Sequence, residues 1–447
     1  MIIKHSGGRT MAEEILRHDV EDETTLTYEE AVAEAKRCLQ CKHKPCVDGC
    51  VAHMNIPEMI KKFLEGEGDE ARAVAISGNA FPQICGRVCY QEIQCELKCV
   101  RNKVNQPVKI GKIERFIGDT YKNPIPKISE PYLGKVAVIG SGPAGLAVVR
   151  DLIQENVKVD VFEKKNYFGG VLRYGIPQFR LPNEIVLKQI EELENAGATF
   201  NRDQNLSKTF KLADLFERGY DAVFIGVGAS ADNYLDIQGK TSPKVVSWKK
   251  FMEIVNLYDE PMKHTLFSEV TTITCIGGGN VAMDVVRSAR RLGMQAHLVY
   301  RRTVDRMPAR IEEVQEAHEE GVIFHPLRDP FLVNQREDGK IELNCVVTEL
   351  FVDEQNPRGL IKNTQENETL LCDMVVMAIG SSVRSLHEEG LETDEYHRIL
   401  VDETQKTSLD SVYAGGDAVT GSLTVIHALK TGKNAARSIL DQLRQTK

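Results

Sequence analysis

Two segments of this 447-residue chain place a glycine-rich turn between a β-branched run and a helical run. In the first, KVAVI precedes the turn Gly140–Gly145, and LAVVRDLIQEN and VKVDVFE follow. In the second, TITCI precedes Gly277–Ala282, and AMDVVRSARRLG and AHLVYRR follow. This order of strand, turn, helix and strand is the βαβ unit of a parallel sheet. The chain is therefore predicted to be an α/β protein with two Rossmann-like nucleotide-binding domains.

The first turn, GSGPAG, has the features of a dinucleotide site. Gly140, Gly142 and Gly145 allow the tight turn, the close approach of a pyrophosphate and the packing of helix on strand. The N-terminus of the following helix favours negative charge. Glu163 ends the next strand 18 residues after Gly145, where a carboxylate accepts hydrogen bonds from ribose hydroxyls. We interpret the turn as a dinucleotide site rather than a chance glycine turn.

The second turn differs from the first at the end of its second strand. Tyr300, Arg301 and Arg302 stand there, where the first unit has Glu163. An acid would repel a 2′-phosphate, whereas arginine binds a phosphate with two parallel hydrogen bonds. The second site is therefore predicted to bind NADP(H) rather than NAD(H). The alternative is that Arg301 and Arg302 are solvated surface charges.

Two dinucleotide sites in one chain indicate two redox cofactors. Hydride transfer between a nicotinamide and a flavin is the usual reason to hold both, so the first site is predicted to hold FAD. A later strand and turn, YAGGD, end at Gly416 and Asp417 before a helix that starts near Thr424. Disulfide reductases share this plan, but neither nucleotide turn is accompanied by Cys-x4-Cys or Cys-x2-Cys.

Cysteines are concentrated at the start of the chain. Of eleven cysteines, Cys275, Cys345 and Cys372 lie in apolar stretches and are predicted to be core thiols. Metal or cluster ligation is predicted for the other eight, because a reducing compartment disfavours disulfides. Iron-sulfur clusters are favoured, since they would pass single electrons onward from a flavin. The alternative is a zinc-stabilised, colourless interaction protein. These eight are Cys38, Cys41, Cys46, Cys50, Cys85, Cys89, Cys95 and Cys99.

The first 120 residues are predicted to form a small all-helical region. Thr27 and Glu30 have capping-box spacing, so a helix is expected over 27–38. Two helices and a turn are expected over 56–81, and the proline-rich KNPIPKISEPYLG is expected to link this region to the next.

Charge and hydropathy exclude some partners. With 56 Lys and Arg against 65 Asp and Glu, the net charge is −9, which disfavours nucleic acid. No apolar run approaches the roughly 18 residues that cross a bilayer, and MIIKHSGGRTMAEEIL lacks the apolar core of a secretion signal. We therefore expect a cytoplasmic protein with no membrane partner.

Several ordered motifs resemble those of one known family. They are RCLQCKHKPCVDGC, ICGRVCYQEIQCELKC followed by IGKIERF, VIGSGPAGLA, GGVLRYGIPQFRLP, IGGGNVAMDVVRSARRLG, VYRRTVDRMPA and GGDAVTGSLTVIHALKTGKNAA. Over residues 25 to 440 the chain is similar to the small chain (beta subunit) of NADPH-dependent glutamate synthase. Relatives include the N-terminal half of dihydropyrimidine dehydrogenase and the large subunit of NADH-dependent ferredoxin:NADP oxidoreductase. The resemblance implies a helical domain (1–125), an FAD domain (132–242 and 378–447) and an inserted NADPH domain (243–377).

The resemblance implies two interleaved 4Fe-4S clusters. The first would be held by Cys38, Cys41, Cys46 and Cys99. The second would be held by Cys50, Cys89, Cys95 and a carboxylate, Glu114. Cys85 is the rival fourth ligand, and Glu114 could instead solvate a helix face. Val51 and Tyr90 stand where many relatives have proline, which weakens the assignment to one branch of the family.

The resemblance also implies cofactor-binding residues and a mechanism without a general acid or nucleophile. Hydride would pass from NADPH to FAD, and single electrons would leave through the clusters. The acceptor would be a glutamate synthase large chain, another electron-accepting flavin and iron-sulfur subunit, as in bifurcating ferredoxin:NADP oxidoreductases or sulfide dehydrogenases, or ferredoxin. For FAD the residues are Gly140, Gly142, Pro143, Ala144, Gly145, Glu163, Gly169, Gly170, Arg180, Gly416, Asp417, Thr424 and Val425. For NADPH they are Gly277, Gly278, Gly279, Asn280, Val281, Ala282, Arg301, Arg302, Arg306, Ala378, Ile379 and Gly380.

Overall fold

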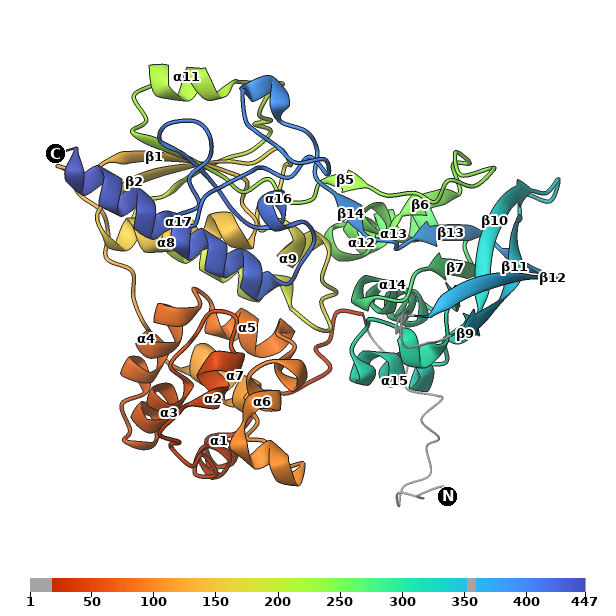
Figure 1. Ribbon diagram of the computed structural model, residues 1–447, viewed down its shortest axis with the longest axis horizontal. Helices are drawn as coiled ribbons and strands as arrows, with labels where there is room; N and C mark the ends of the chain where they lie inside the picture. Colours follow the sequence, from red (N-terminus) through yellow and green to blue (C-terminus); the bar gives the residue numbers. More distant parts are fainter. Residues whose placement is uncertain (1–17, 352–358, 447) are drawn as a thin grey trace. The chain divides into compact units, whose positions relative to one another are not determined.

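The computed structural model describes residues 18–351 and 359–446 and divides into two compact units (Figure 1). The large unit comprises Glu21–Ile176, Arg180–Asp232 and the chain from Gly380 onward. The small unit comprises Asn233–Ile379 and Pro177–Phe179, together with residues 18–20 at the start of the described chain.

The large unit begins with a region of short helices. The capping box predicted at its start is present, because the Glu30 amide donates to Thr27 Oγ1 and the Thr27 amide to Glu30 Oε2. That helix ends at Ala35, three residues before Cys38. The helices are α1 (Tyr28–Ala35), α2 (Pro45–Gly49), α3 (Ile56–Leu64), α4 (Gly68–Gly78), α5 (Pro82–Val88), α6 (Cys95–Lys98) and α7 (Ile110–Thr120), with 3-10 helices η1 (Gln91–Ile93) and η2 (Val100–Val104).

The rest of the large unit is the first Rossmann-like domain. Its five-stranded parallel sheet has the order β15-β4-β1-β2-β3, and α8 (Pro143–Gln154) follows the central strand. The strands are β1 (Lys135–Ile139), β2 (Lys158–Phe162), β3 (Thr199–Asn201), β4 (Ala222–Ile225) and β15 (Val412–Ala414), with a small pair, β5 (Ala231–Asp232) and β14 (Ser381–Ser382). The remaining helices are α9 (Val171–Tyr174), α10 (Asn183–Ala196), α11 (Leu212–Glu217), α16 (Asp417–Thr420) and α17 (Val425–Gln445).

The small unit is the second Rossmann-like domain, inserted between β5 and β14 of the first, as predicted. Its parallel sheet has the order β6-β13-β7-β8-β9. An antiparallel sheet of β10, β11 and β12 was not predicted from the sequence. The strands are β6 (Val245–Ser247), β7 (Thr272–Ile276), β8 (Gln295–Tyr300), β9 (Ile323–Pro326), β10 (Arg328–Gln335), β11 (Ile341–Phe351), β12 (Leu360–Cys372) and β13 (Met374–Met377). The helices are α12 (Trp248–Leu257), α13 (Glu260–Phe267), α14 (Asn280–Arg291) and α15 (Ile311–Glu319), with 3-10 helix η3 (Val304–Arg306).

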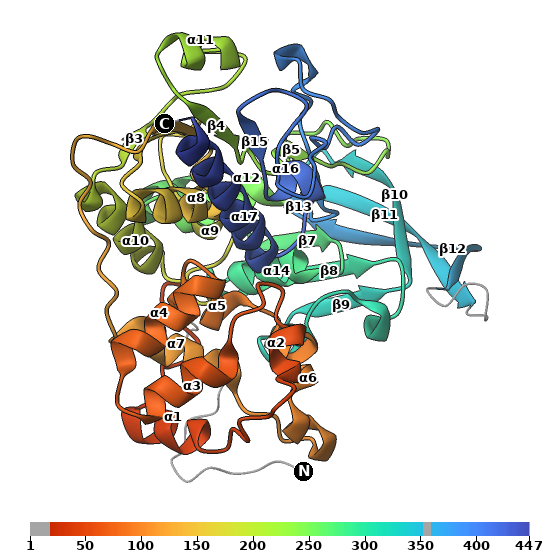
Figure 2. The same cartoon turned by 60° about the vertical axis from the view of Figure 1, so that its left-hand side comes forward.

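Within the large unit, the short helices and the first Rossmann-like domain share one apolar core. Ile84 and Val88 of α5, with Phe81 at its N-cap, belong to the same buried cluster as residues of α8 and α17. Figure 2 shows α5 beneath the ends of α8, α10 and α17. Cys275, Cys345 and Cys372 are buried in the small unit, which confirms that they are core thiols. No helix in the described parts of the chain is long and apolar enough to cross a bilayer.

Candidate functional site

The first glycine turn joins β1 to α8, and its backbone atoms are closely packed. Gly140 has a left-handed φ of +100°, which glycine adopts without strain. A β-carbon at Gly145 would collide with the carbonyl oxygen of Gly140, so the turn tolerates only glycine there. Gly142 is the N-cap of α8 and Pro143 its first residue. The unpaired amides and positive end of α8 are therefore directed at whatever occupies the turn.

Glu163 is buried and holds the first turn in place. Its Oε2 accepts hydrogen bonds from the Ser141 amide (3.0 Å) and hydroxyl (2.7 Å), and its Oε1 accepts from the Lys165 amide (3.0 Å). Ser141 Oγ in turn accepts from the Gly169 amide at 3.1 Å. Ser141 was not predicted from the sequence, because nothing in GSGPAG indicates that its hydroxyl would bind Glu163. The carboxylate thus orders the turn itself.

Two further segments approach the start of α8. A β-carbon at Gly170 would lie 2.7 Å from Gly142 Cα, and one at Gly416 would lie 3.0 Å from Ala144 Cβ. The Gly416 amide donates to Thr431 Oγ1 at 2.8 Å, which fixes the turn before α16 to α17. The structure therefore brings the predicted FAD residues around Gly142, Gly170 and Gly416 together.

The other predicted FAD residues flank this site. Thr424 is the N-cap of α17, which begins at Val425, and its hydroxyl lies 2.7 Å from His427 Nδ1. Burial, with Lys430 nearby, lowers the pKa of His427. Asp417 Oδ1 accepts from the Leu423 amide at 3.3 Å. Arg180 returns the chain to the large unit and is half-buried.

The second glycine turn is folded against the segment that follows β8. A β-carbon at Gly277 would collide with the Ala378 carbonyl oxygen, and one at Gly278 would lie 2.5 Å from the Tyr300 ring. The Ala309 amide donates to the Gly278 carbonyl (3.1 Å), and the Arg310 amide donates to Asn280 Oδ1 (2.7 Å). Residues 300–310 therefore lie beside the N-terminus of α14.

Arg301, Arg302 and Arg306 lie in this segment. The Arg301 side chain is exposed, and its carbonyl accepts from Thr348 Oγ1 at 3.1 Å. The Arg302 carbonyl accepts from the Leu327 amide at 3.1 Å. No carboxylate among the described residues lies within ion-pair distance of the Arg301 or Arg302 side chain, whereas Arg306 Nε lies 3.3 Å from Asp305 Oδ2. Two guanidinium groups beside a helix N-terminus suit a phosphate.

The first set of predicted cluster ligands surrounds one cavity. Cys38, Cys41, Cys46 and Cys99 all line it. Burial and the neighbouring thiols Cys38 and Cys99 raise the pKa of Cys46 to about 11. Such thiols ionise readily only when a metal takes up their charge. The other lining residues are Leu39, Pro45, Ile56, Pro57, Ile60, Val100, Arg101, Val108 and Ile110. An apolar cavity with four thiols fits an iron-sulfur cluster.

The second set is gathered deeper in the same unit. Burial raises the pKa of Cys50 to about 11, with Glu114 and Cys89 nearby, and it also raises the pKa of Cys95, next to the same groups. Cys85 also belongs here, because it hydrogen-bonds Cys89 and is close to Glu114. Both candidate fourth ligands therefore lie beside these three thiols. Among the described residues, no three His, Cys, Asp or Glu side chains converge closely enough to hold a single metal ion.

Glu114 is 5% exposed, so it does not solvate a helix face. Burial raises the pKa of its carboxyl to about 8, although a 2.6 Å hydrogen bond from Asn79 Nδ2 acts to lower it. Asn79 Oδ1 accepts from the Phe81 amide at 3.0 Å, which fixes the orientation of the amide group. No sequence signal marks Asn79, since only the packing of α7 against residues 79–81 pairs it with Glu114. A neighbouring cation would favour the ionised carboxylate.

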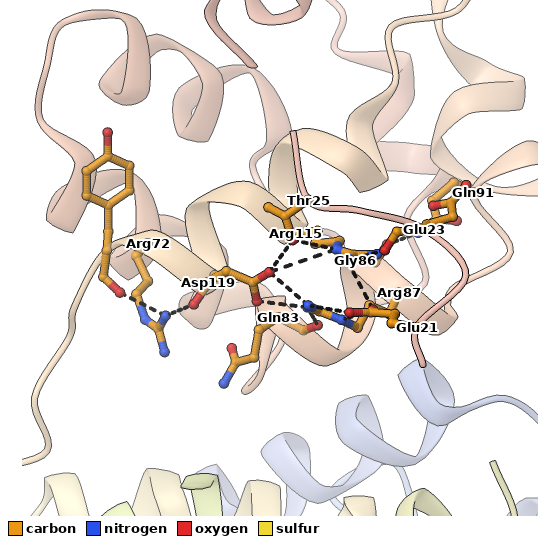
Figure 3. Close-up of polar contacts among 12 residues, drawn as sticks. Glu21, Glu23, Thr25, Arg72, Gln83, Gly86, Arg87, Gln91, Arg115 and Asp119 are labelled. Carbon is orange, nitrogen blue, oxygen red and sulfur yellow. Dashed lines mark hydrogen bonds and ion pairs between the residues drawn. The ribbon is translucent and has the colours of Figure 1, made fainter. Parts of the chain in front are cut away.

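A network of charged groups joins α5 to α7 (Figure 3). Arg87 binds Glu21 through Nε (2.6 Å) and Asp119 through Nη1 (2.8 Å), and Arg115 Nη2 lies 3.0 Å from Glu21 Oε1. The helices approach closely because a β-carbon at Gly86 would lie 2.6 Å from the Arg115 amide nitrogen. The network thus fixes the two helices that carry Cys85 and Glu114.

Comparisons with known proteins match both halves of the chain. Residues 17–124 match the family model of dihydropyrimidine dehydrogenase domain II, 4Fe-4S cluster. Residues 134–432 match the model of pyridine nucleotide-disulphide oxidoreductases, which thus covers well over half of the chain.

Curated relatives match along most of the chain. The glutamate synthase [NADPH] small chain of Escherichia coli is 32% identical over 437 residues, or 93% of this chain and 92% of that protein. The NADP(+)-dependent formate dehydrogenase subunit beta of Moorella thermoacetica is 34% identical over 433 residues, or 90% of this chain. The match spans only 60% of that longer subunit.

A solved structure, Mycobacterium tuberculosis FprA in complex with NADPH, matches with a TM-score of 0.57 and 20% identity. The match covers 70% of this chain and 84% of that one. At this identity the likeness concerns the fold alone, and it agrees with the predicted architecture.

Proposed function

Because the chain belongs to the glutamate synthase small chain family, within the pyridine nucleotide-disulphide oxidoreductases, we propose that it is an NADPH-dependent oxidoreductase that holds FAD and two 4Fe-4S clusters. The bound groups would supply hydride transfer from NADPH to FAD and single-electron transfer through the clusters to a partner. Each turnover converts NADPH and two oxidised one-electron acceptors into NADP+, a proton and two reduced acceptors. The observation that carries the proposal is the cavity lined by four cysteines, in a unit whose core continues into the first Rossmann-like domain.

The chain's own residues bind and orient the nucleotides. The amides at the start of α8 are proposed to bind the FAD pyrophosphate, with Gly170 and Gly416 leaving room beside them. Glu163 keeps this turn in shape through Ser141. In the small unit, the start of α14 is proposed to bind the NADPH pyrophosphate, and Arg301 and Arg302 its 2′-phosphate.

The thiols are proposed to hold the clusters in the sets that the resemblance implies. Cys38, Cys41, Cys46 and Cys99 line a single cavity, which supports the first set. The second set is proposed to be Cys50, Cys89, Cys95 and Glu114. Support for Glu114 comes from its burial with only a neutral amide as partner, because a buried carboxyl gains most from a nearby cation.

The fourth ligand of the second cluster can be tested with a pair of variants. If Glu114 is the ligand, Glu114→Ala loses iron and changes the electron paramagnetic resonance (EPR) signal of one cluster, whereas Cys85→Ala keeps both. The opposite pattern would assign the position to Cys85. Iron counts and EPR spectra of the reduced, anaerobically purified proteins decide between them.

The electron acceptor is proposed to be a protein in the cytoplasm. Curated relatives are named as a glutamate synthase small chain and a formate dehydrogenase beta subunit, which supports a partner subunit. We propose a glutamate synthase large chain as that partner. The alternatives are a flavin and iron-sulfur subunit of a bifurcating ferredoxin:NADP or sulfide dehydrogenase-type complex, and free ferredoxin.

The deciding experiment is an anaerobic visible spectrum with iron and flavin counts, followed by titration with NADPH and then NADH. We expect a flavin band over broad cluster absorbance, about eight irons per chain from two four-iron clusters, and bleaching preferentially by NADPH. A colourless protein that contains zinc would overturn the proposal. A yellow protein without iron would leave a flavoenzyme and refute the two clusters.

A further inference from the structure

The two segments that frame the first cysteine set are strongly basic. Residues 36–46 contain four Lys and Arg, residues 98–112 contain five, and neither segment contains Asp or Glu. The whole chain has the opposite balance, with 56 Lys and Arg against 65 Asp and Glu. Positive charge is therefore concentrated in these two segments of an acidic protein, although the Glu34 carboxylate pairs with Arg37 and accepts from the Lys109 amide.

The basic segments meet at the cavity of the first cysteine set. Lys42 follows the lining residue Cys41, and Lys109 stands between two others, Val108 and Ile110. Lys103 lies two residues after the lining residue Arg101. All three lysines are exposed, and none is within ion-pair distance of a carboxylate in the described residues. We call these three lysines the basic rim.

Exposed apolar side chains accompany the basic rim. Leu39, which lines the cavity, is 57% exposed, and Val104, next to Lys103, is 67% exposed. Three thiols of the first set are half-buried and only Cys46 is buried, whereas in the second set Cys89 and Cys95 are buried and only Cys50 is half-buried. The first set is thus the one nearer to solvent.

We propose that the basic rim, with Leu39 and Val104, is the docking surface for a small redox protein with an acidic face, which takes electrons one at a time. This inference rests on the proposed function and, of the partners named there, selects the small one-electron acceptor over a large chain. Charge complementarity of this kind steers a partner into place and speeds its association, while a few apolar contacts hold the short-lived complex. An acidic partner fits because the rim carries cations that have no carboxylate partner in the described chain.

The test uses the anaerobic holoprotein, NADPH and oxidised rubredoxin, a small acidic iron protein that accepts one electron. One NADPH reduces two rubredoxins and releases NADP+ and a proton. The test variant reverses the rim charges (Lys42→Glu, Lys103→Glu, Lys109→Glu). The matched control reverses three exposed lysines elsewhere in the large unit (Lys127→Glu, Lys188→Glu, Lys208→Glu). A neutral quinone serves as the acceptor that needs no docking.

We expect the rim variant to reduce rubredoxin at least about tenfold more slowly at low salt, with quinone reduction unchanged. The wild-type rate should fall as salt rises from about 0.02 to about 0.3 M, and this dependence should disappear in the rim variant. The control variant should behave as wild type. If the glutamate variant contains less iron than wild type, the glutamine version of the same triple variant should still show an intermediate loss.

Several outcomes would overturn the proposal. They are a wild-type rubredoxin rate that salt does not change, equal losses in the rim and control variants, and quinone reduction without rubredoxin reduction. Tight binding of a 30-nucleotide single-stranded RNA at the rim at physiological salt would also overturn it, in favour of a nucleic acid. Failure of NADPH to reduce even the quinone would instead refute the proposed function.

Discussion

The two Rossmann-like domains use the same strand, turn and helix but differ in charge where the second strand ends. In the large unit that strand is followed by Glu163, which is buried and bonded to Ser141 of the turn. In the small unit it is followed by Arg301 and Arg302, whose side chains have no carboxylate partner in the described chain. One carboxylate completes the protein's own turn, whereas the two guanidinium groups remain available for an anion. This difference supports the proposal that the same backbone serves two nucleotides of different charge.

The domains also differ at the last residue of the turn, which is Gly145 in the large unit and Ala282 in the small unit. This difference predicts the largest effect of a substitution. Gly145→Ala would place a β-carbon against the Gly140 carbonyl oxygen. We therefore expect the free energy of unfolding to fall by about 3 kcal/mol or more, and the protein to lose its flavin. The small unit has Ala282 at this position, and Ala282→Gly should cost only about 1 kcal/mol. Flavin content and thermal unfolding measure both.

Gly142→Ala is the control for this prediction, because a β-carbon there would have open space around it. It should change the unfolding temperature by little, although it narrows the approach to the α8 N-terminus. Equal stability of the Gly145→Ala and Gly142→Ala proteins would refute the steric argument.

The charge difference predicts the next largest effect. Replacing Arg301 and Arg302 together by Ala should raise KM for NADPH by about 100-fold, because two charge-assisted hydrogen bonds to a phosphate contribute about 3 kcal/mol. KM for NADH should change by less than about threefold, since NADH lacks that phosphate. Steady-state kinetics with the quinone acceptor measure both constants.

Arg336→Ala is the matched control, since Arg336 is an arginine at the β10–β11 turn of the same unit. Equal increases in KM for the two nucleotides would show that Arg301 and Arg302 do not read the 2′-phosphate.

A smaller effect is expected at Glu163. In Glu163→Gln, an amide NH2 group replaces one carboxylate oxygen, so the turn loses an acceptor for the Ser141 amide or the Lys165 amide. We expect about tenfold weaker FAD binding, equivalent to about 1.4 kcal/mol. The FAD dissociation constant of the stripped protein, compared with that of Ser141→Ala, provides the measurement. If both variants bind FAD as tightly as wild type, the hydrogen bonds that order the turn do not contribute to flavin binding.

The smallest effect concerns pH and is confined to the small unit. His297 on β8 stands where β2 of the large unit has Asp160, and its Nδ1 lies 2.8 Å from Nε2 of His325. Burial lowers the pKa of both rings, and Glu368 and Arg328 are the charged groups near His325. The unfolded chain therefore binds more protons than the folded chain below the ordinary histidine pKa of 6.5, and stability is lost as pH falls through that range.

Thermal unfolding between about pH 8 and about pH 5.5 tests this prediction. His325→Gln should flatten the decline of the unfolding temperature with acidity, whereas His264→Gln, at an exposed position on α13, should not. An unchanged slope in the His325→Gln protein would assign the acid sensitivity to other groups.

The features found from sequence are those encoded by neighbouring residues. Glycine turns, the α1 capping box and cysteine spacing each depend on residues within a few positions, so they are readable directly. Pairs made by packing are not: Asn79 meets Glu114 only because α7 lies against residues 79–81, and Ser141 meets Glu163 across two strands. The β10–β12 sheet was missed, since β12 is mostly polar and shows no strong apolar alternation.

The core shared by α5 and the first Rossmann-like domain has a consequence for the cell. Cys85 and Cys89 belong to that core, so we expect the region proposed to bind iron and the region proposed to bind the flavin to fold as one piece. We expect that, under iron starvation, empty thiol sets would lower the stability of both regions, so that the whole chain would be degraded by proteases. Iron supply would then set the abundance of the enzyme. Cells would not accumulate protein that holds flavin without clusters and reduces oxygen.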